Sequence, residues 1–294
     1  MQRDFVGYGG NPPRVEWPGG ARIAISLCIN VEEGSELSPY FGDQSQQPFG
    51  SESSARPAGV RSLAAESLWE YGARAGGWRL LRLLKQEGVK ATFFVCGMAL
   101  EQNPPFARAI VDGGHEVLGH GYRWIPQWHL EPDAERAYIR QAVDAITRTT
   151  GRRPLGWFSR GGPSLNTREI LNEEGFLYDS EAFNDDLPYY VRVKGEPWLV
   201  VPYAFDSNDS AGNTWLNADH FFGYLKDSFD LLYEEGATEP RMLSVGLHTK
   251  RSGRPGQAAA VRRFIRYCAG HPKVWFAGRD EIARWWWERY PPDR

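Results

Sequence analysis

The chain has 294 residues, a length that α/β barrels reach as one domain. We expect a single domain over 1–294, with an N-terminal extension (1–20) and a long loop (35–62). Hydrophobic residues at 41% and charged residues at 24% are ordinary for a globular protein and exclude disorder over most of the chain. The formal net charge of -3 favours neither nucleic acid nor an anionic membrane, so neither is expected as a partner.

The cysteines and the N-terminus bear on localisation. Cys28, Cys96 and Cys268 are odd in number and far apart, which favours reduced thiols over disulfides or a metal knuckle. Residues 1–15 lack the apolar core and cleavage site of a signal peptide, and no apolar run approaches the length of a membrane span. The sequence therefore predicts a cytoplasmic protein.

Predicted strands and helices alternate along the chain. Strands are expected at 21–29, 91–96, 116–118, 155–158, 177–178, 198–205, 242–247 and 274–276, and helices at 78–87, 105–112, 134–149, 168–174, 221–235, 257–269 and 280–289. This order indicates parallel strands joined by right-handed crossovers. Seven or eight such units favour a (β/α) barrel, and the absence of GxGxxG after the first strand argues against a dinucleotide-binding fold.

Polar side chains follow these predicted strands. They are Glu32, His120, Arg160, Asp179, Asp206 and His248. Because parallel strands of a barrel end at one face, we expect these residues to gather there, where barrel enzymes carry out their chemistry.

Three of these positions suggest particular roles. Glu32 and the adjacent Glu33 offer a general base or a metal ligand, although a solvated loop is the alternative. His120 lies between two glycines and suits metal binding or proton transfer, whereas a turn histidine bonded to a carbonyl is the structural alternative. His248 ends an apolar strand in a polar loop, which favours a functional role, with a core histidine as the structural alternative.

The spacing of ligands argues against a resident metal. A catalytic zinc site needs three protein ligands around an open position. Glu32 and His120 lie at matching places, but the residue four positions after His120 is Trp124. We predict no cofactor, and if a metal such as Zn²⁺ were bound, Glu32 and His120 would be its ligands.

Several longer stretches resemble the polysaccharide deacetylase, or NodB-homology, superfamily, and within it the cofactor-independent allantoinases of the PuuE type. They are VGYGGNPP (6–13), NVEEG (30–34), ESLWEYGARAG (66–76), HGYRW (120–124) and NDDLPY (184–189). The resemblance extends from Phe5 to Trp287. It implies a distorted (β/α) barrel of about seven or eight parallel strands and hydrolysis of non-peptide C–N bonds.

The same resemblance marks departures from the deacetylase pattern. That pattern has a catalytic Asp, a metal-binding Asp two positions later, His-x-x-x-His, an Arg-containing motif and a late histidine. The matching positions hold Asn30, Glu32, His120 with Trp124, Arg160 and His248. Asn30 cannot act as a base and Trp124 cannot ligate zinc, so the resemblance favours the allantoinase branch and a metal-free amidohydrolase.

We therefore predict ring opening of a small cyclic amide or ureide such as allantoin. Glu32 or Glu33 with His120 would supply the base, and Arg160 or His248 would stabilise charge or return the proton. Side chains expected to bind substrate are Asn30, Glu33, Tyr122, Trp124, Asp185 and Asp206, with the two aromatic rings forming a flat wall.

Two other functions stay open. One is a polysaccharide deacetylase that acts on N-acetyl sugars with Zn²⁺ or another divalent metal. The other is a non-catalytic barrel that binds a carbohydrate or nucleobase derivative, which Asn30 and Trp124 favour. The 12 Trp, 13 Tyr and 15 Phe, together with the resemblance, predict a homo-oligomer.

Overall fold

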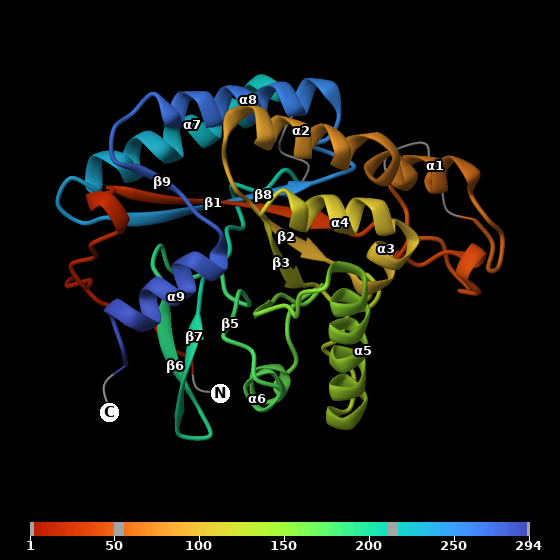
Figure 1. Ribbon diagram of the computed structural model, residues 1–294. Coiled ribbons are helices and arrows are strands. Elements are labelled where there is room, and N and C mark those ends of the chain that lie inside the picture. Colours follow the sequence, from red (N-terminus) through yellow and green to blue (C-terminus); the bar gives the residue numbers. More distant parts are fainter. Residues whose placement is uncertain (1–2, 50–55, 211–216, 293–294) are drawn as a thin grey trace.

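A curled sheet of mostly parallel strands forms the centre of the fold (Figure 1). The computed structural model describes residues 3–49, 56–210 and 217–292. Its sheet has the order β6-β7-β5-β4-β3-β2-β1-β8, with β9 also paired to β1. The strands are β1 (Ile23–Val31), β2 (Thr92–Val95), β3 (Glu116–Gly119), β4 (Gly156–Trp157), β5 (Tyr178–Asp179), β6 (Tyr189–Val193), β7 (Glu196–Val200), β8 (Arg241–His248) and β9 (Val274–Phe276).

The sheet confirms the distorted (β/α) barrel that the sequence predicts. Among the strands described, each pairing is parallel apart from the β6–β7 hairpin. Strand β6 is not among the strands expected from the sequence. Lys194 and Gly195 have φ values of 52° and 87° and close the hairpin, although lysine is an uncommon residue in that conformation. The strand expected at 198–205 is also shorter, because β7 ends at Val200.

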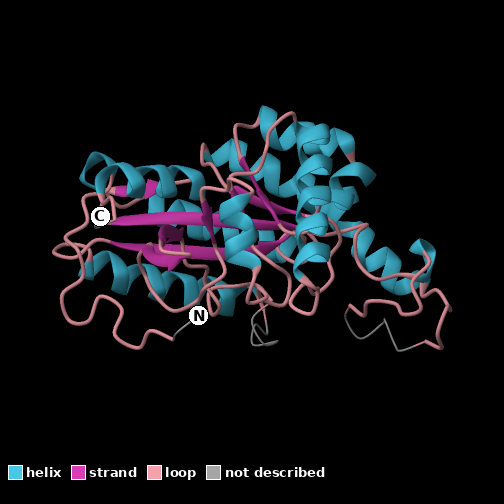
Figure 2. Ribbon diagram, turned by 90° about the horizontal axis from the view of Figure 1, so that it is seen from below, coloured by secondary structure: helices cyan, strands magenta, loops and turns pink. Residues whose placement is uncertain are grey.

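Helices cover the sheet (Figure 2). They are α1 (Leu63–Tyr71), α2 (Gly77–Glu87), α3 (Gly97–Gln102), α4 (Pro104–Asp112), α5 (Pro132–Thr150), α6 (Thr167–Glu173), α7 (Ala218–Glu235), α8 (Pro255–Ala269) and α9 (Arg279–Arg289), with 3₁₀ turns at Pro18–Gly20 and Pro39–Phe41. Helices α1 and α3 were not predicted, because α3 has only six residues and α1 follows directly on a Ser/Gly-rich segment. Residues 1–2 of the expected extension and 50–55 of the expected loop lie outside the described residues.

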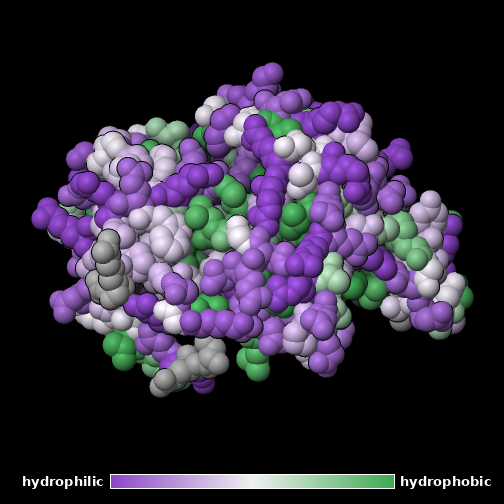
Figure 3. Space-filling view, turned by 60° about the horizontal axis from the view of Figure 1, so that its bottom comes forward, coloured by the Kyte–Doolittle hydropathy of each residue, from purple (hydrophilic) through white to green (hydrophobic). Residues whose placement is uncertain are grey.

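The surface shows no sign of a membrane segment in the part of the chain described. None of its helices combines the length and apolar character needed to cross a bilayer. On the face shown in Figure 3, hydrophilic residues predominate and exposed apolar residues form separate patches.

The central strand β1 sets the direction of the functional side chains. All nine of its residues are buried, as expected for a parallel strand covered on both faces. Odd-numbered residues such as Ile25 and Ile29 pack in one apolar cluster with residues of α2, α7 and α8. Even-numbered Ala24 and Cys28 belong to a second cluster on the other side of the sheet. Asn30 and then Glu32 continue this even-numbered face toward the barrel interior.

A glycine between α1 and α2 allows close packing against the loop that follows β8. A single π-helical turn at Gly72–Gly76 connects α1 to α2. A Cβ at Gly76 would overlap the carbonyl oxygen of Thr249, the residue directly after β8. The helix pair can therefore approach this loop only because position 76 has no side chain.

Gly76→Ala is expected to destabilise the fold by about 1–3 kcal/mol, because either the helix or the 249–253 loop must shift. Gly223→Ala in α7 is the matched control, since its Cβ would have no atom within 4 Å. That control should be neutral or add up to about 1 kcal/mol through helix propensity. Urea unfolding of both variants measures the difference, and equal stabilities would contradict the close packing.

A buried carboxyl connects the ends of β4 and β5. Glu181 is 8% exposed, and its Oε1 accepts a hydrogen bond of 2.6 Å from the amide of Ser159. Its Oε2 has no hydrogen-bond partner within the described residues. Burial, and secondarily the charge of Asp179, raise the pKa of Glu181 to about 8.

Glu181→Gln should therefore stabilise the protein at alkaline pH. The pKa is higher in the folded chain than the ordinary 4.5, so wild-type stability falls between about pH 4.5 and 8, where only the folded state keeps the proton. The variant should gain on the order of a few kcal/mol over wild type above pH 8 and little near pH 4.5. Urea unfolding at both pH values, with exposed Glu234→Gln as control, tests this; a gain independent of pH would contradict it.

Candidate active site

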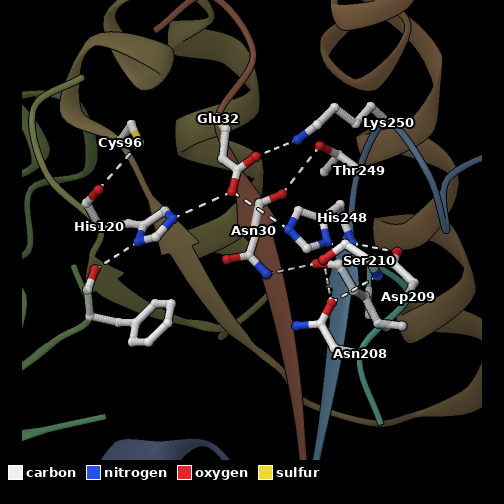
Figure 4. A network of polar contacts seen from close by, with 12 residues as sticks. Asn30, Glu32, Cys96, His120, Asn208, Asp209, Ser210, His248, Thr249 and Lys250 are labelled. Carbon is white, nitrogen blue, oxygen red and sulfur yellow. Dashed lines mark hydrogen bonds and ion pairs between the residues drawn. The ribbon is translucent and has the colours of Figure 1, made fainter. Parts of the chain in front are cut away.

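Glu32 is the centre of a buried polar cluster at the end of β1 (Figure 4). It is the first residue after the strand and is 1% exposed. Its Oε1 lies 3.4 Å from His120 Nε2 and 3.6 Å from His248 Nε2. Its Oε2 forms an ion pair with Lys250 Nζ. One carboxylate thus faces two imidazoles and one ammonium.

Backbone geometry orients His120. The residue follows β3, and its Nδ1 lies 2.7 Å from the carbonyl oxygen of Phe158. A carbonyl can only accept, so Nδ1 carries the hydrogen and Nε2 is directed at Glu32. The ring also stacks on Phe158, with an interplanar angle of 8°. The carbonyl contact expected of a structural turn histidine is therefore present, and it leaves Nε2 available for chemistry.

A second carboxylate orients His248. Asp209 Oδ1 lies 2.6 Å from His248 Nδ1, and its Oδ2 accepts hydrogen bonds from the His248 amide and the Ser252 hydroxyl. Burial would raise the pKa of Asp209, but the charge of His248 and these hydrogen bonds lower it. Ionised Asp209 thus holds the hydrogen on Nδ1 and directs Nε2 toward Glu32.

Charge compensation keeps Glu32 ionised. Burial alone would raise its pKa, but Lys250, His248 and His120 outweigh that effect and hold the pKa of Glu32 well below its usual range. Burial likewise opposes the charge of Lys250, yet Glu32 and Glu33 raise the Lys250 pKa above its ordinary value. Both groups are therefore charged at neutral pH.

Asn30 and Glu33 flank the cluster but have partners of their own. The Asn30 amide nitrogen donates to Tyr203 Oη at 3.2 Å and to the Leu247 carbonyl at 3.0 Å. Glu33 accepts from the Thr249 hydroxyl and from the Glu32 amide, and it lies against the Gly72 backbone. Of the two adjacent carboxylates, Glu32 alone faces both histidines.

Trp124 and Arg160 border the cluster, because the Trp124 ring contacts Lys250 and the charge of Glu32 acts on Arg160. The Arg160 guanidinium is half-buried, with its Cζ 4.1 Å from the centre of the Trp124 ring. Burial lowers the Arg160 pKa, and the charge of Glu32 opposes that shift. The arrangement places a planar cation and a planar indole beside the same carboxylate.

Other residues singled out in the sequence contact different partners. Tyr122 donates to Glu101 of α3, and Asp206 is exposed and accepts from Tyr224 of α7. Asp185 accepts from the Leu187 amide and lines a groove beside the N-terminal segment 3–13. Asp179 lies within β5, where it pairs with Arg168 at 2.7 Å, and not after the strand.

Sequence reasoning missed Asp209 and Lys250. Asp209 belongs to the same polar run as Asp206, and the shorter strand β7 leaves Asp209, not Asp206, beside His248. Lys250 follows His248 by two residues, and a lysine next to a strand-end histidine was the available signal.

The residues present do not fit a catalytic divalent metal. Across residues 3–49, 56–210 and 217–292, no group of three His, Cys, Asp or Glu side chains has an arrangement that could hold a metal ion. Trp124 occupies the position where a second histidine would be needed, and the Lys250 ammonium already neutralises Glu32. A divalent cation at Glu32 would meet a fixed positive charge on the same carboxylate.

Known proteins share this fold and most of its length. The family profile described as polysaccharide deacetylase matches residues 65–178. A putative polysaccharide deacetylase of Schizosaccharomyces pombe is 34% identical over an alignment of 314 residues, gaps included, that covers 98% of each chain. A solved structure of a probable polysaccharide deacetylase from Pseudomonas aeruginosa PAO1 is 48% identical with a TM-score of 0.94, covering 100% of both chains.

A solved structure of Puue allantoinase is similar to the same degree. It is 46% identical, covers 100% of this chain and 99% of its own, and superposes with a TM-score of 0.94. These full-length similarities, together with the curled parallel sheet and the polar cluster at its carboxyl end, show that the chain belongs to the polysaccharide deacetylase family.

Proposed function

We propose that this carbon–nitrogen hydrolase opens a small cyclic amide or ureide, such as allantoin, without a metal ion. The observation that carries the proposal is the Lys250–Glu32 ion pair beside Trp124, which puts a fixed cation and an indole where metal-dependent chemistry would need a ligand and a free carboxylate. The 46% identity to Puue allantoinase supports the same substrate class.

The cluster contains the groups that this reaction needs. In the proposed mechanism, Glu32 accepts a proton from a water molecule as its oxygen attacks the ring carbonyl carbon. Arg160 stabilises the oxyanion that forms. Glu32 passes this proton to Nε2 of His120 or His248, both of which face it, and the imidazole delivers it to the leaving nitrogen as the C–N bond breaks. Trp124 offers a flat apolar surface for a planar ring.

Metal-dependent deacetylation of an N-acetyl sugar is the second candidate. One carboxylate oxygen and two imidazole Nε2 atoms converge within 3.6 Å, which is the observation in its favour. The Lys250 ammonium on the same carboxylate is the observation against it.

The proposal also includes a homo-oligomeric, cytoplasmic enzyme. The sequence features given above support both properties. Analytical ultracentrifugation and cell fractionation test them directly.

Activity should survive exhaustive chelation. Purified protein treated with EDTA and dialysed is expected to keep full turnover of a hydantoin or ureide substrate, because protein groups alone activate the water. The assay compares hydantoins, ureides, cyclic imides and N-acetylglucosamine oligomers with and without Zn²⁺. Activity that is lost on chelation and restored by Zn²⁺ would support the deacetylase instead. Thermal stabilisation by a ligand without turnover would indicate a non-catalytic barrel.

His120→Ala should reduce kcat by about 10² to 10⁴-fold, the usual contribution of a positioned acid or base. Exposed His129 lies five residues after Trp124 and supplies the matched control His129→Ala, which should keep wild-type turnover. Circular dichroism and unfolding midpoints establish that both variants are folded. Near-normal turnover of the His120 variant would show that His120 has no catalytic role and serves only as a structural residue through its contact with Phe158.

A further inference from the structure

Lys250 is a buried cation that the reaction steps above do not use. It lies in the loop directly after β8 and is 3% exposed. Its Nζ pairs with Glu32 Oε2 and lies 3.9 Å from Glu33 Oε1. An ammonium this deep is costly unless opposite charges compensate it, and here two carboxylates do so.

Two indole rings enclose the same ammonium. Lys250 Nζ lies 4.3 Å from the ring centre of Trp69 in α1 and 5.5 Å from that of Trp124. The two rings contact each other at 5.1 Å between centres. Aromatic faces attract cations, and desolvation strengthens that attraction. Carboxylates and indoles together therefore form a complete site for one monovalent cation.

The backbone builds this site from distant segments. In the β1–β8 register Asn30 is the partner of His248, so Glu32 and Lys250, each two residues further on, leave the sheet side by side. Gly76 packs on the Thr249 carbonyl and holds the 249–253 loop against the α1–α2 joint. The ammonium is thus held between Glu32 at the end of β1 and the connection between α1 and α2.

We propose that Lys250 is a positioning residue whose ammonium takes the place of a metal ion, fixing Glu32 as a charged base turned toward the two histidines and excluding divalent cations. This inference rests on the proposed metal-free function and explains how the site works without a metal. Lys250 acts through Glu32 and needs no contact with the substrate.

Zinc titration calorimetry provides a test that requires no substrate. Wild type, Trp124→His, Lys250→Met and the double variant are titrated with Zn²⁺ alone. Trp124→His should bind weakly, because the ammonium still opposes the metal even though a further histidine has been added. The double variant should bind at least about tenfold more tightly than Trp124→His, because the repelling charge is gone. Equal affinities, or tight binding by Trp124→His with Lys250 intact, would overturn the proposal.

Turnover of the preferred cyclic amide is the second readout. Lys250→Met should lower kcat by about 10²-fold with a smaller change in KM, whereas Lys250→Arg should recover part of that loss because it keeps the charge. Lys85→Met, at an exposed position of α2, is the matched control. Arginine and methionine variants with the same kcat would show that the charge is irrelevant and would overturn the proposal.

Folding is tested in a separate variant. If Lys250→Met is unfolded, Glu32→Gln/Lys250→Met removes both charges of the Glu32–Lys250 ion pair and should recover the folded state. Failure to recover would argue against the ion-pair role. Loss of wild-type activity on chelation, in contrast, would overturn the proposed function itself, whatever the zinc titrations show.

Discussion

The Glu32–Lys250 ion pair is the constraint on which the site depends. A carboxylate that is 1% exposed cannot stay ionised without a nearby cation, and an ammonium that is 3% exposed cannot stay charged without a carboxylate. Each charged group is therefore stable in the interior only because the other is present. The parallel register of β1 and β8 supplies this match, because it brings the residues after both strands to the same point. A hydrogen bond at Nδ1 orients each of the two histidine rings, so that Nε2 faces Glu32.

The barrel could be predicted from sequence because its strands are short, apolar and separated by helices with clear ends. The positions of the predicted strand ends also indicate where the site lies. Glu32, His120 and His248 each follow or end a parallel strand, so fold topology alone predicts that they converge at one face. The structure does bring the Nε2 atoms of both histidines within 3.6 Å of Glu32 Oε1. Alternation along β1 further explains why Glu32 and Glu33, although adjacent, have different environments.

The residues that orient Glu32 and the two histidines, or compensate their charges, could not be predicted in the same way. Asp209, Lys250 and Trp69 lie in loops or in a helix that periodicity did not reveal, and their contacts depend on loop paths of a few residues. Asp206 illustrates the limit: a strand ending at Val200 instead of Phe205 moves the relevant carboxylate by three positions. Tyr122 illustrates another limit: it lies only two positions before Trp124, yet its hydroxyl contacts Glu101 of α3 while the Trp124 indole contacts Lys250 and Arg160.

The proposed replacement of a metal ion by the Lys250 ammonium would change what the site can bind. A divalent ion needs open coordination positions and brings water with it, whereas an ammonium donates only along three N–H directions and is satisfied here by carboxylates and indole faces. The positive charge that Glu32 needs is then enclosed and not exposed to the substrate. In the proposed mechanism, Arg160, half-buried on Trp124, is the cation that stabilises the substrate oxyanion. This proposed separation of roles, with one cation for the base and another for the oxyanion, supports the proposed small planar substrate more than it supports a polymer chain.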